Sequence, residues 1–338
     1  MENIKVVRHL GEEEWRSFVE QSPTGNIFHT PEMFQVFSLT KHFRPEIWAA
    51  VDNFNRPLAL LLPVRITVLD GLLRRLSTRA VVFGSILCAP GAEGGIALPL
   101  LLEAYKHECG NANLFTEMRN LSNLTEIQPI LREQGFVYED HLNYLINLKR
   151  SPEEIFDSFG RRTRKNIRRG IKQGMVHIEV LNERKDISMC YDMLKKVYKL
   201  ARIPLADQSL FESAFDLLFP KGMIMVTVAR VGQAPAAVSI ELLYKDIIYG
   251  WYGATDRTYS SHVPNELLMW HILKWGAEHG YQCYDFGGAG KPDEDYGVRN
   301  FKAKFSGELV NFGRNTYIHS SRLLALSKLG YSTLRRFL

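Results

Sequence analysis

Residues 284–290 read YDFGGAG, and residues 301–307 read FKAKFSG. The first segment is typical of a buried strand that ends in a glycine-rich loop, where the missing Cβ atoms let the backbone approach a ligand closely. The second is a short basic-aromatic segment, interpreted as an amphipathic edge strand. The local pattern alone favours a structural role. Asp285 on the strand, with Lys302 and Lys304 after the loop, also fits a site for an anionic substrate.

A strongly basic segment precedes this region. Residues 161–172 contain seven lysines or arginines and no acid. A solvated helix face is the usual fate of such a run, but like charges on neighbouring turns repel by about 0.2–0.5 kcal/mol per pair. We therefore favour an anionic partner, namely the phosphates of tRNA, of a nucleotide-linked precursor or of lipid headgroups, with Arg164, Lys165 and Arg168 as candidate contacts. No helix-turn-helix or zinc-finger pattern accompanies the run, which argues against DNA.

Composition indicates a globular protein of about two domains. The chain has 338 residues, with 46% hydrophobic residues, 23% charged residues and a formal net charge of +5. Its four cysteines lie far apart without a Cys-x-x-Cys pair, which argues against a zinc site or a secreted disulfide framework and favours buried thiols in a reducing compartment. No signal-peptide core or membrane span is apparent, so we expect a cytoplasmic protein.

The first half alternates helical and strand-like segments. Helices are expected at 12–21, from Thr30-Pro31 to about 41, and at 96–109 and 126–134; strands are expected at 48–51, 58–68, 81–89, 112–118 and, as a pair, 136–148.

The second half begins near Ser151-Pro152. One helix is expected from there to about residue 174, and three consecutive strands at 223–230, 236–244 and 247–254 predict an antiparallel meander. Further helices are expected at 187–200, 208–218 and 264–279, and further strands at 176–181 and 281–286. We therefore predict domains at 1–150 and 151–319, followed by a basic amphipathic helix at 320–338, which either packs on the body or contacts a membrane surface.

Two motifs resemble one family. Asp285-Phe-Gly-Gly288, followed by Gly297-x-x-x-Phe301-Lys302-x-x-Phe305, resembles the signature near the C-terminus of the Fem aminoacyltransferases, the FemA, FemB and FemX types that build peptidoglycan cross-bridges. Residues 156–174 resemble the basic helix that opens the second domain of that family. The resemblance implies an α/β (α+β) fold of two tandem GNAT-like domains, each a mixed, mostly antiparallel sheet flanked by helices.

The resemblance also implies a reaction. An aminoacyl group is transferred from aminoacyl-tRNA to an amine of a nucleotide- or lipid-linked muropeptide precursor, with no resident cofactor or metal. In this family the lysine that matches Lys302 is implicated in stabilising the transition state, and a positioned ammonium can do this by stabilising an oxyanion. Phe301 packs beside it. Asp285 either accepts a proton from the amine or serves as a structural partner.

Other substrate contacts are carried over on looser matches. Family members bind substrate phosphates with a lysine of the first domain and an arginine of the second, and Lys41 and Arg202 fit these positions. Gly287 and Gly288 are candidates for close substrate approach, and Tyr252 is either a core residue or a pocket wall.

Two alternatives remain open. One is a related GNAT N-acyltransferase that uses acyl-coenzyme A in exopolysaccharide, cell-envelope or lipid biosynthesis. Residues 260–265 read SSHVPN and lack the glycines that hold the coenzyme pyrophosphate in ordinary GNAT enzymes, which weakens that alternative. The other is a non-enzymatic adaptor for nucleic acid or membranes.

Overall fold

The computed structural model describes residues 4–68, 71–110 and 112–334, which form two compact units. Unit 1 comprises residues 1–140 and 312–338, and unit 2 comprises residues 141–311. The chain therefore passes between the units twice, whereas the predicted segments place one boundary at 150 and another at 319. The difference arises because residues 142–147 pair in the sheet of unit 2 and residues 314–318 pair in a sheet of unit 1.

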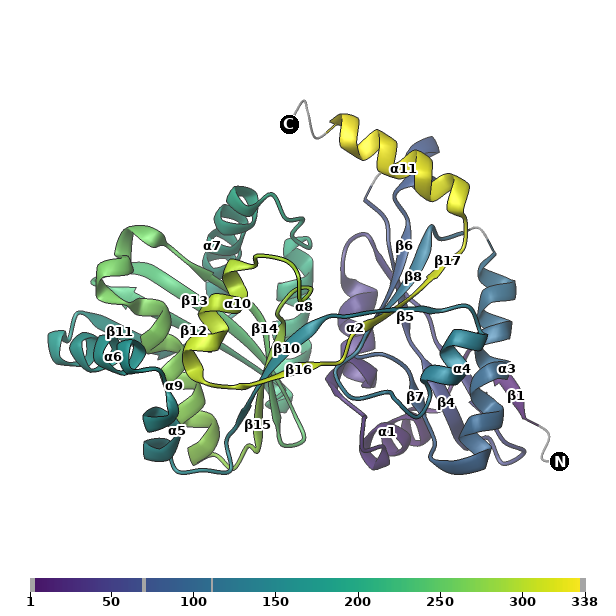
Figure 1. Ribbon diagram of the computed structural model, residues 1–338, viewed down its shortest axis with the longest axis horizontal. Helices are drawn as coiled ribbons and strands as arrows, with labels where there is room; N and C mark the ends of the chain where they lie inside the picture. The colour runs from purple at the N-terminus through teal and green to yellow at the C-terminus, as the bar shows by residue number, and fades with distance from the viewer. Residues whose placement is uncertain (1–3, 69–70, 111, 335–338) are drawn as a thin grey trace. The chain divides into compact units, whose positions relative to one another are not determined.

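Unit 1 contains two sheets (Figure 1). The four-stranded sheet has the order β1-β3-β4-β7, and the six-stranded sheet has the order β2-β5-β6-β8-β17-β9. The strands are β1 (Lys5–Val7), β2 (Phe43–Pro45), β3 (Trp48–Val51), β4 (Pro57–Leu61), β5 (Pro63–Ile66), β6 (Arg79–Phe83), β7 (Leu87–Cys88), β8 (Phe115–Arg119), β9 (Val137–Glu139) and β17 (Arg314–Ile318). The helices are α1 (Glu12–Gln21), α2 (Pro31–Leu39), α3 (Gly91–Cys109), α4 (Gln128–Glu133) and α11 (Ser321–Leu334).

Local chemistry explains the start of α2. The Thr30 hydroxyl accepts a hydrogen bond from the Met33 backbone N–H at 3.2 Å, and Pro31 occupies the first helical position, as predicted. Two single-strand predictions were wrong. Residues 58–68 divide at Leu62 into β4 and β5, which belong to different sheets, and residues 81–89 divide into β6 and β7. A continuous apolar run does not reveal where a strand changes sheets.

Unit 2 is built on one seven-stranded sheet of order β11-β12-β13-β14-β15-β10-β16. The predicted meander is confirmed, since β12, β13 and β14 pair antiparallel in succession. The strands are β10 (Leu142–Asn147), β11 (Val176–Val180), β12 (Ile224–Val231), β13 (Ala234–Tyr244), β14 (Ile247–Thr255), β15 (Cys283–Gly288) and β16 (Glu308–Asn311). The helices are α5 (Pro152–Ser158), α6 (Arg161–Gln173), α7 (Asp186–Ala201), α8 (Gln208–Leu218), α9 (Pro264–Glu278) and α10 (Gly297–Lys302).

The predicted helix from 151 to 174 is two helices. Phe159 and Gly160 have extended ψ angles of 151° and 140° and separate α5 from α6. Phe159 is buried at this break and makes edge-on ring contacts with Phe305 and Trp270, at centroid distances of 5.2 and 5.7 Å. Burial of this ring accounts for the interruption, which the helical periodicity of the sequence did not show.

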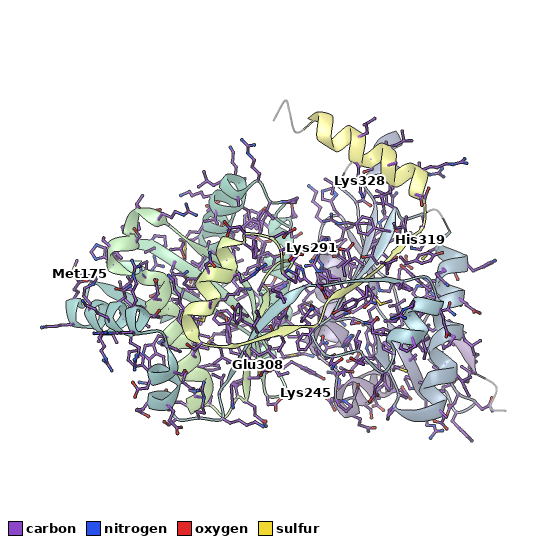
Figure 2. The ribbon with its side chains drawn as sticks, viewed as in Figure 1. Met175, Lys245, Lys291, Glu308, His319 and Lys328 are labelled. Carbon is purple, nitrogen blue, oxygen red and sulfur yellow. The ribbon has the colours of Figure 1, made fainter. Side chains whose placement is uncertain are left out.

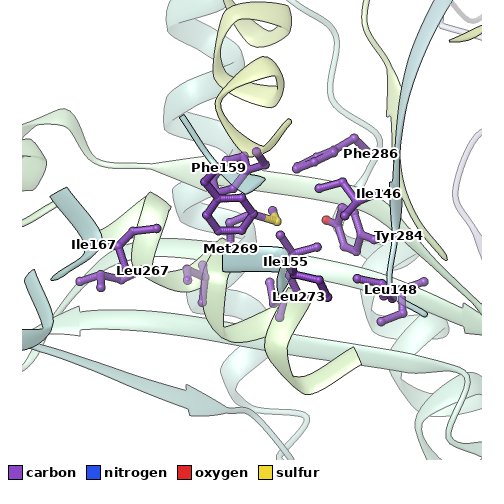
Figure 3. Close-up of a cluster of buried hydrophobic side chains, with 14 of the residues drawn as sticks. Ile146, Leu148, Ile155, Phe159, Ile167, Leu267, Met269, Leu273, Tyr284 and Phe286 are labelled. Carbon is purple, nitrogen blue, oxygen red and sulfur yellow. The ribbon is translucent and has the colours of Figure 1, made fainter. Parts of the chain in front are cut away.

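The core of unit 2 lies between the sheet and the helices α5, α6 and α9. Figure 3 shows Phe159, Phe286, Ile146 and Met269 gathered at its centre. Toward one side of the cluster, Ile167 of α6 lies beside Leu267 of α9. The core thus joins the opening helices to β15, the strand that leads into the glycine-rich loop.

Two further strand predictions were wrong. Residues 136–148 form β9 and β10, which do not pair with each other but lie in different sheets. Residues 301–305 are helical, because α10 is followed by a 3-10 turn (Ala303–Phe305), and the expected edge strand is instead β16. None of the described helices is both long and apolar enough to cross a membrane.

Candidate functional site

Lys302 is a buried cation bound to the glycine-rich loop. Its side chain is 8% exposed, and its Nζ donates to the carbonyl oxygens of Phe286, Gly287 and Gly288 at 2.6, 3.1 and 2.8 Å. An ammonium has three protons to donate, so these three bonds use all of them. Lys302 therefore holds the end of β15 in place through its backbone.

Arg299, three residues earlier on α10, extends this arrangement. Its Nε donates to the Ala289 carbonyl at 2.8 Å, one terminal nitrogen donates to the Pro292 carbonyl at 2.9 Å, and the other donates to the Lys291 carbonyl. Residues three apart lie on the same face of a helix. Two cations on one face of α10 thus bind six carbonyls, three at the end of β15 and three in the loop after it, and we call this arrangement the carbonyl clamp.

Asp285 lies at the same end of β15 and is 4% exposed. Its Oδ1 accepts a hydrogen bond from the Gly287 backbone N–H at 2.7 Å and another from the Asn143 side chain of β10 at 3.3 Å. Asn143 was not predicted as a site residue, because its position opposite Gly288, within reach of Asp285, depends on pairing between strands about 140 residues apart in the chain.

Burial sets the protonation of this pair. It raises the pKa of Asp285 to about 6, against the opposing effects of the Gly287 N–H, Lys302 and Asn143. Burial also lowers the pKa of Lys302 to about 8, and the nearby Asp285 charge opposes that shift. Near neutral pH the site accordingly holds a carboxylate and an ammonium whose proton affinities lie much closer together than in water.

The loop geometry requires glycine at Gly287. Its φ is +67°, and an added Cβ would lie 3.1 Å from the Tyr249 hydroxyl. At Gly288 an added Cβ would lie 2.8 Å from Nε2 of His141. Gly287 and Gly288 were predicted to let a substrate approach the backbone closely. The space beside their Cα atoms is instead filled by the side chains of Tyr249 and His141.

β14 and β15 pair in parallel only from Ile247 to Tyr249, opposite Cys283 to Asp285. Asp285 lies at the last of these pairs, where the parallel ladder ends. The clamp and the carboxylate thus meet at the point where two neighbouring strands of the sheet stop pairing.

A second buried carboxyl group, Glu241 of β13, lies on the same sheet. It accepts a short hydrogen bond from the Ser239 hydroxyl and another from Tyr284, and burial raises its pKa to about 8. Its Oε2 has no hydrogen-bond partner among the described residues. Glu241 was not among the predicted site residues, although it is the one acid in the otherwise uncharged strand 236–244, which is the signal that could have identified it.

Tyr252 belongs to a wall of aromatic rings. A bulge in β14 places Trp251 as an extra residue between the pairs Glu241–Gly250 and Ile240–Tyr252. Trp251 and Tyr252 consequently both reach Phe211 of α8, with ring centroids 5.9 and 4.8 Å away.

The aromatic wall continues toward the loop after the clamp. Tyr198 of α7 lies 6.0 Å from Tyr252 between ring centroids. Burial, and then the nearby Tyr296, raise the pKa of Tyr198 to about 12. Tyr296 in turn lies beside Gly290, where an added Cβ would be 3.1 Å from its ring.

The lysines of the FKAK segment have different environments. Lys304 is exposed, pairs with Glu266 at 2.8 Å and lies 5.2 Å from the ring centre of Phe301. Phe301 is half-buried and packs on Phe305 at 5.3 Å between ring centroids. The structure thus separates two lysines that the sequence pattern left similar.

The remaining predicted contacts lie on other elements of the chain. Arg202 is the exposed residue after α7, with a φ of +53°, and Lys41 lies in a turn of unit 1. On α6, Arg164 and Arg168 pair with Asp157 at 3.3 and 3.8 Å, whereas Lys165 is exposed.

The basic C-terminal helix α11 packs on unit 1, where the Ser327 hydroxyl donates to the Leu76 carbonyl at 2.6 Å. Residues 335–338 of the predicted helix lie outside the described residues. The four cysteines are free thiols; Cys190 is buried, and Cys88, Cys109 and Cys283 are half-buried. Among the described residues, no group of three or more histidine, cysteine or carboxylate side chains is arranged to hold a metal ion.

Comparison with known sequences supports the domain type. Residues 158–301 match a family model described as an acetyltransferase (GNAT) domain, and this span contains α6, the loop, Asp285 and Phe301. The acyltransferase class predicted from the sequence is confirmed at the level of this domain.

Short matches point to one group of enzymes. A 58-residue stretch is 40% identical to the lipid II:glycine glycyltransferase of Staphylococcus haemolyticus and 38% identical to that of Staphylococcus saprophyticus. Each match covers 16% of this chain and 14% of the relative, so the comparison spans about a seventh of the relatives' length.

Solved structures share the fold over almost the whole chain. The crystal structure of FemX has a TM-score of 0.71 at 15% identity and covers 95% of this chain and 99% of its own. A tandem GNAT protein from the clavulanic acid pathway has a TM-score of 0.59 at 12% identity and covers 94% of this chain and 99% of its own. The C-terminal domain of a putative lysylphosphatidylglycerol synthetase from Agrobacterium fabrum has a TM-score of 0.59 at 14% identity, with 95% and 96% covered. Together the comparisons show a GNAT domain in residues 158–301 and similarity to Fem-type glycyltransferases and to FemX, and they confirm the predicted resemblance and α/β fold class.

Proposed function

We propose that this protein is a Fem-type acyltransferase that transfers an aminoacyl group to an amine of a peptidoglycan precursor. The observation that carries the proposal is the buried Asp285–Lys302 pair at the glycine-rich loop of β15. Perturbed acids and bases gathered in one place are typical of catalytic sites. The short matches to lipid II:glycine glycyltransferases support the same reaction class.

The proposed chemistry is direct attack by the acceptor amine on the ester carbonyl of the donor. Asp285 is a carboxylate at neutral pH and takes the proton that the amine loses. Because Oδ1 already accepts two hydrogen bonds, proton acceptance falls to Oδ2. The C–N amide bond forms, the C–O ester bond breaks, and the leaving alkoxide oxygen takes up the proton that Asp285 accepted from the amine.

Lys302 stabilises the oxyanion that forms during this attack. Since all three of its protons are donated to loop carbonyls, it must exchange one of those bonds for the oxyanion. The longest bond, 3.1 Å to the Gly287 carbonyl, is the one we expect to be exchanged. Removing one such donor costs about 2.7–4 kcal/mol in other enzymes.

We further propose aminoacyl-tRNA as donor and a lipid- or nucleotide-linked muropeptide as acceptor, with no resident cofactor, in the cytoplasm. The aromatic wall of Tyr198, Trp251 and Tyr252 offers half-buried ring surface for the acceptor. Arg202 and Lys41 remain proposed contacts for substrate phosphates.

A transfer assay tests the proposal. Purified protein is incubated with labelled aminoacyl-tRNA and, separately, with labelled acetyl-coenzyme A, and each donor is offered lipid-linked and nucleotide-linked muropeptides. We expect label to move from tRNA to the acceptor amine and transfer to be abolished by ribonuclease. No transfer from tRNA to either acceptor would contradict the proposed reaction.

Coenzyme A-dependent N-acyl transfer is the second candidate, because residues 158–301 match a domain described as an acetyltransferase. In the same assay this reaction moves label only from acetyl-coenzyme A. The Asp285–Lys302 pair could serve either donor, so the assay distinguishes the donors without changing the assignment of the site.

A further inference from the structure

The helix α6 carries cations that the protein itself does not neutralise. Among the described residues, no carboxylate pairs with its exposed cations, which are Arg161, Arg162, Lys165, Arg169 and Lys172. The helix also begins at Gly160 without a side-chain cap and has no acid in its first turn. Positive charge at a helix N-terminus opposes the helix dipole, so this arrangement is unfavourable unless an anion binds there.

Apolar side chains are exposed among these cations. Ile171 is 59% exposed and Met175 is 52% exposed, and Met175 lies at the outer edge of unit 2 (Figure 2). Gly170 holds this end of α6 close to α9, because an added Cβ there would lie 2.9 Å from the Leu267 side chain. The exposed apolar residues are therefore fixed in position relative to α9.

A hollow of about 320 Å³ continues the apolar surface between α6, β11 and α9. It is bordered by apolar side chains and two basic residues, and no carboxylate lines it. The lining comprises Gly170, Ile171, Gly174, Val176, Ile178, Leu267, Trp270, His271 and Lys274.

We propose that this surface, formed by α6, Met175 and the hollow, docks the protein on an anionic phospholipid bilayer. The cations contact lipid phosphates, while Ile171 and Met175 enter the apolar layer beneath them. Cations combined with exposed apolar side chains are typical of helices that lie in a membrane interface. An RNA surface offers phosphates to the cations but no apolar layer for Ile171 and Met175, so the mixed composition favours lipid.

Vesicle co-sedimentation tests this assignment with the full-length protein. The vesicles contain phosphatidylcholine with or without phosphatidylglycerol. Each cation near an anionic membrane contributes about fivefold to binding, so Arg169→Gln with Lys172→Gln is expected to weaken binding about 25-fold. Ile171→Ser with Met175→Ser is expected to weaken it as well. The matched control, Lys195→Gln with Lys199→Gln on α7, removes the same charge from another exposed face and should bind as the wild type does.

Three results would overturn the proposal. The first is wild-type protein that shows no preference for vesicles containing phosphatidylglycerol, and the second is vesicle binding that the α6 substitutions leave unchanged. The third is salt-dependent tRNA binding, lost in Arg169→Gln with Lys172→Gln, in a protein that does not bind the vesicles. That third result would identify the surface as an RNA-binding site.

Discussion

Two basic helices of unit 2, α10 and α6, use their cations in opposite ways. On α10, Lys302 donates to three carbonyls at the end of β15, and Arg299 donates to three carbonyls of the loop that follows it. On α6, five cations are exposed without a carboxylate partner among the described residues. The first set holds the chain together, and the second set is available to a partner.

The comparison teaches that local charge density does not identify a catalytic cation. The segment 161–172 is far more basic than 297–304, yet the buried cation, Lys302, whose pKa burial lowers to about 8, lies on α10. Desolvation, which depends on tertiary packing, separates a cation that acts inside a site from cations that act at a surface.

The largest effect is expected from Lys302→Ala. It removes the proposed oxyanion donor and leaves three loop carbonyls without their cation, so turnover should fall about 100–1,000-fold. Lys304→Ala is the matched control, because this exposed lysine contributes a single surface ion pair, typically worth about 0–1 kcal/mol. Steady-state kinetics of both variants check the prediction, and equal losses would remove the distinction between the two lysines.

The pH dependence of activity tests the roles of Asp285 and Lys302. Activity should fall below about pH 6 as Asp285 becomes protonated and cannot accept a proton, and above about pH 8 as Lys302 loses its charge. The two limbs belong to the coupled pair rather than to either residue alone. Asp285→Asn should lower kcat about 100-fold or more and abolish the acidic limb. An acidic limb that persists in this variant would assign it to another group.

Arg299→Leu tests the structural role of the carbonyl clamp separately from the catalytic roles of Asp285 and Lys302. Losing its bonds to three loop carbonyls should loosen residues 289–292 and cost about 1–3 kcal/mol locally. We expect faster amide hydrogen exchange in that segment and a roughly tenfold loss in kcat/KM carried mainly by KM. If amide hydrogen exchange in residues 289–292 were unchanged and kcat itself fell about tenfold, Arg299 would instead contact the reacting groups.

The smallest effect concerns the stability of α6. Lys165→Glu places an acid four residues from both Arg161 and Arg169, so it replaces repulsion with two favourable pairs and should raise the free energy of unfolding by about 0.5–1 kcal/mol. Thermal unfolding measures this change. Destabilisation would show that Lys165 has a structural role, and the contrast with α10 would then fail.

Much of the fold could be predicted from local patterns. Short stretches of sequence were enough to predict several elements. These are the helix caps at Thr30 and Ser151, the antiparallel meander and the strand before the glycine-rich loop. Sheet membership did not follow, because residues 136–148 read as one pair of strands although β9 and β10 find partners in different sheets. Such pairings join residues far apart in the sequence, and no local pattern encodes them.

The site was predictable to a similar extent. Asp285 stood out as an acid on an apolar strand, and the family motif distinguished Lys302 from Lys304. Arg299 and Asn143 carried no signal, since their roles depend on a loop folding back onto α10 and on β10 pairing with β15.

The most direct test compares transfer by Lys302→Ala with transfer by Arg169→Gln plus Lys172→Gln, using labelled aminoacyl-tRNA and a water-soluble, nucleotide-linked acceptor. The account predicts that Lys302→Ala loses turnover about 100-fold or more, while the α6 variant keeps wild-type turnover because no membrane is involved. The opposite pattern, with transfer retained by Lys302→Ala and lost by the α6 variant, would contradict it.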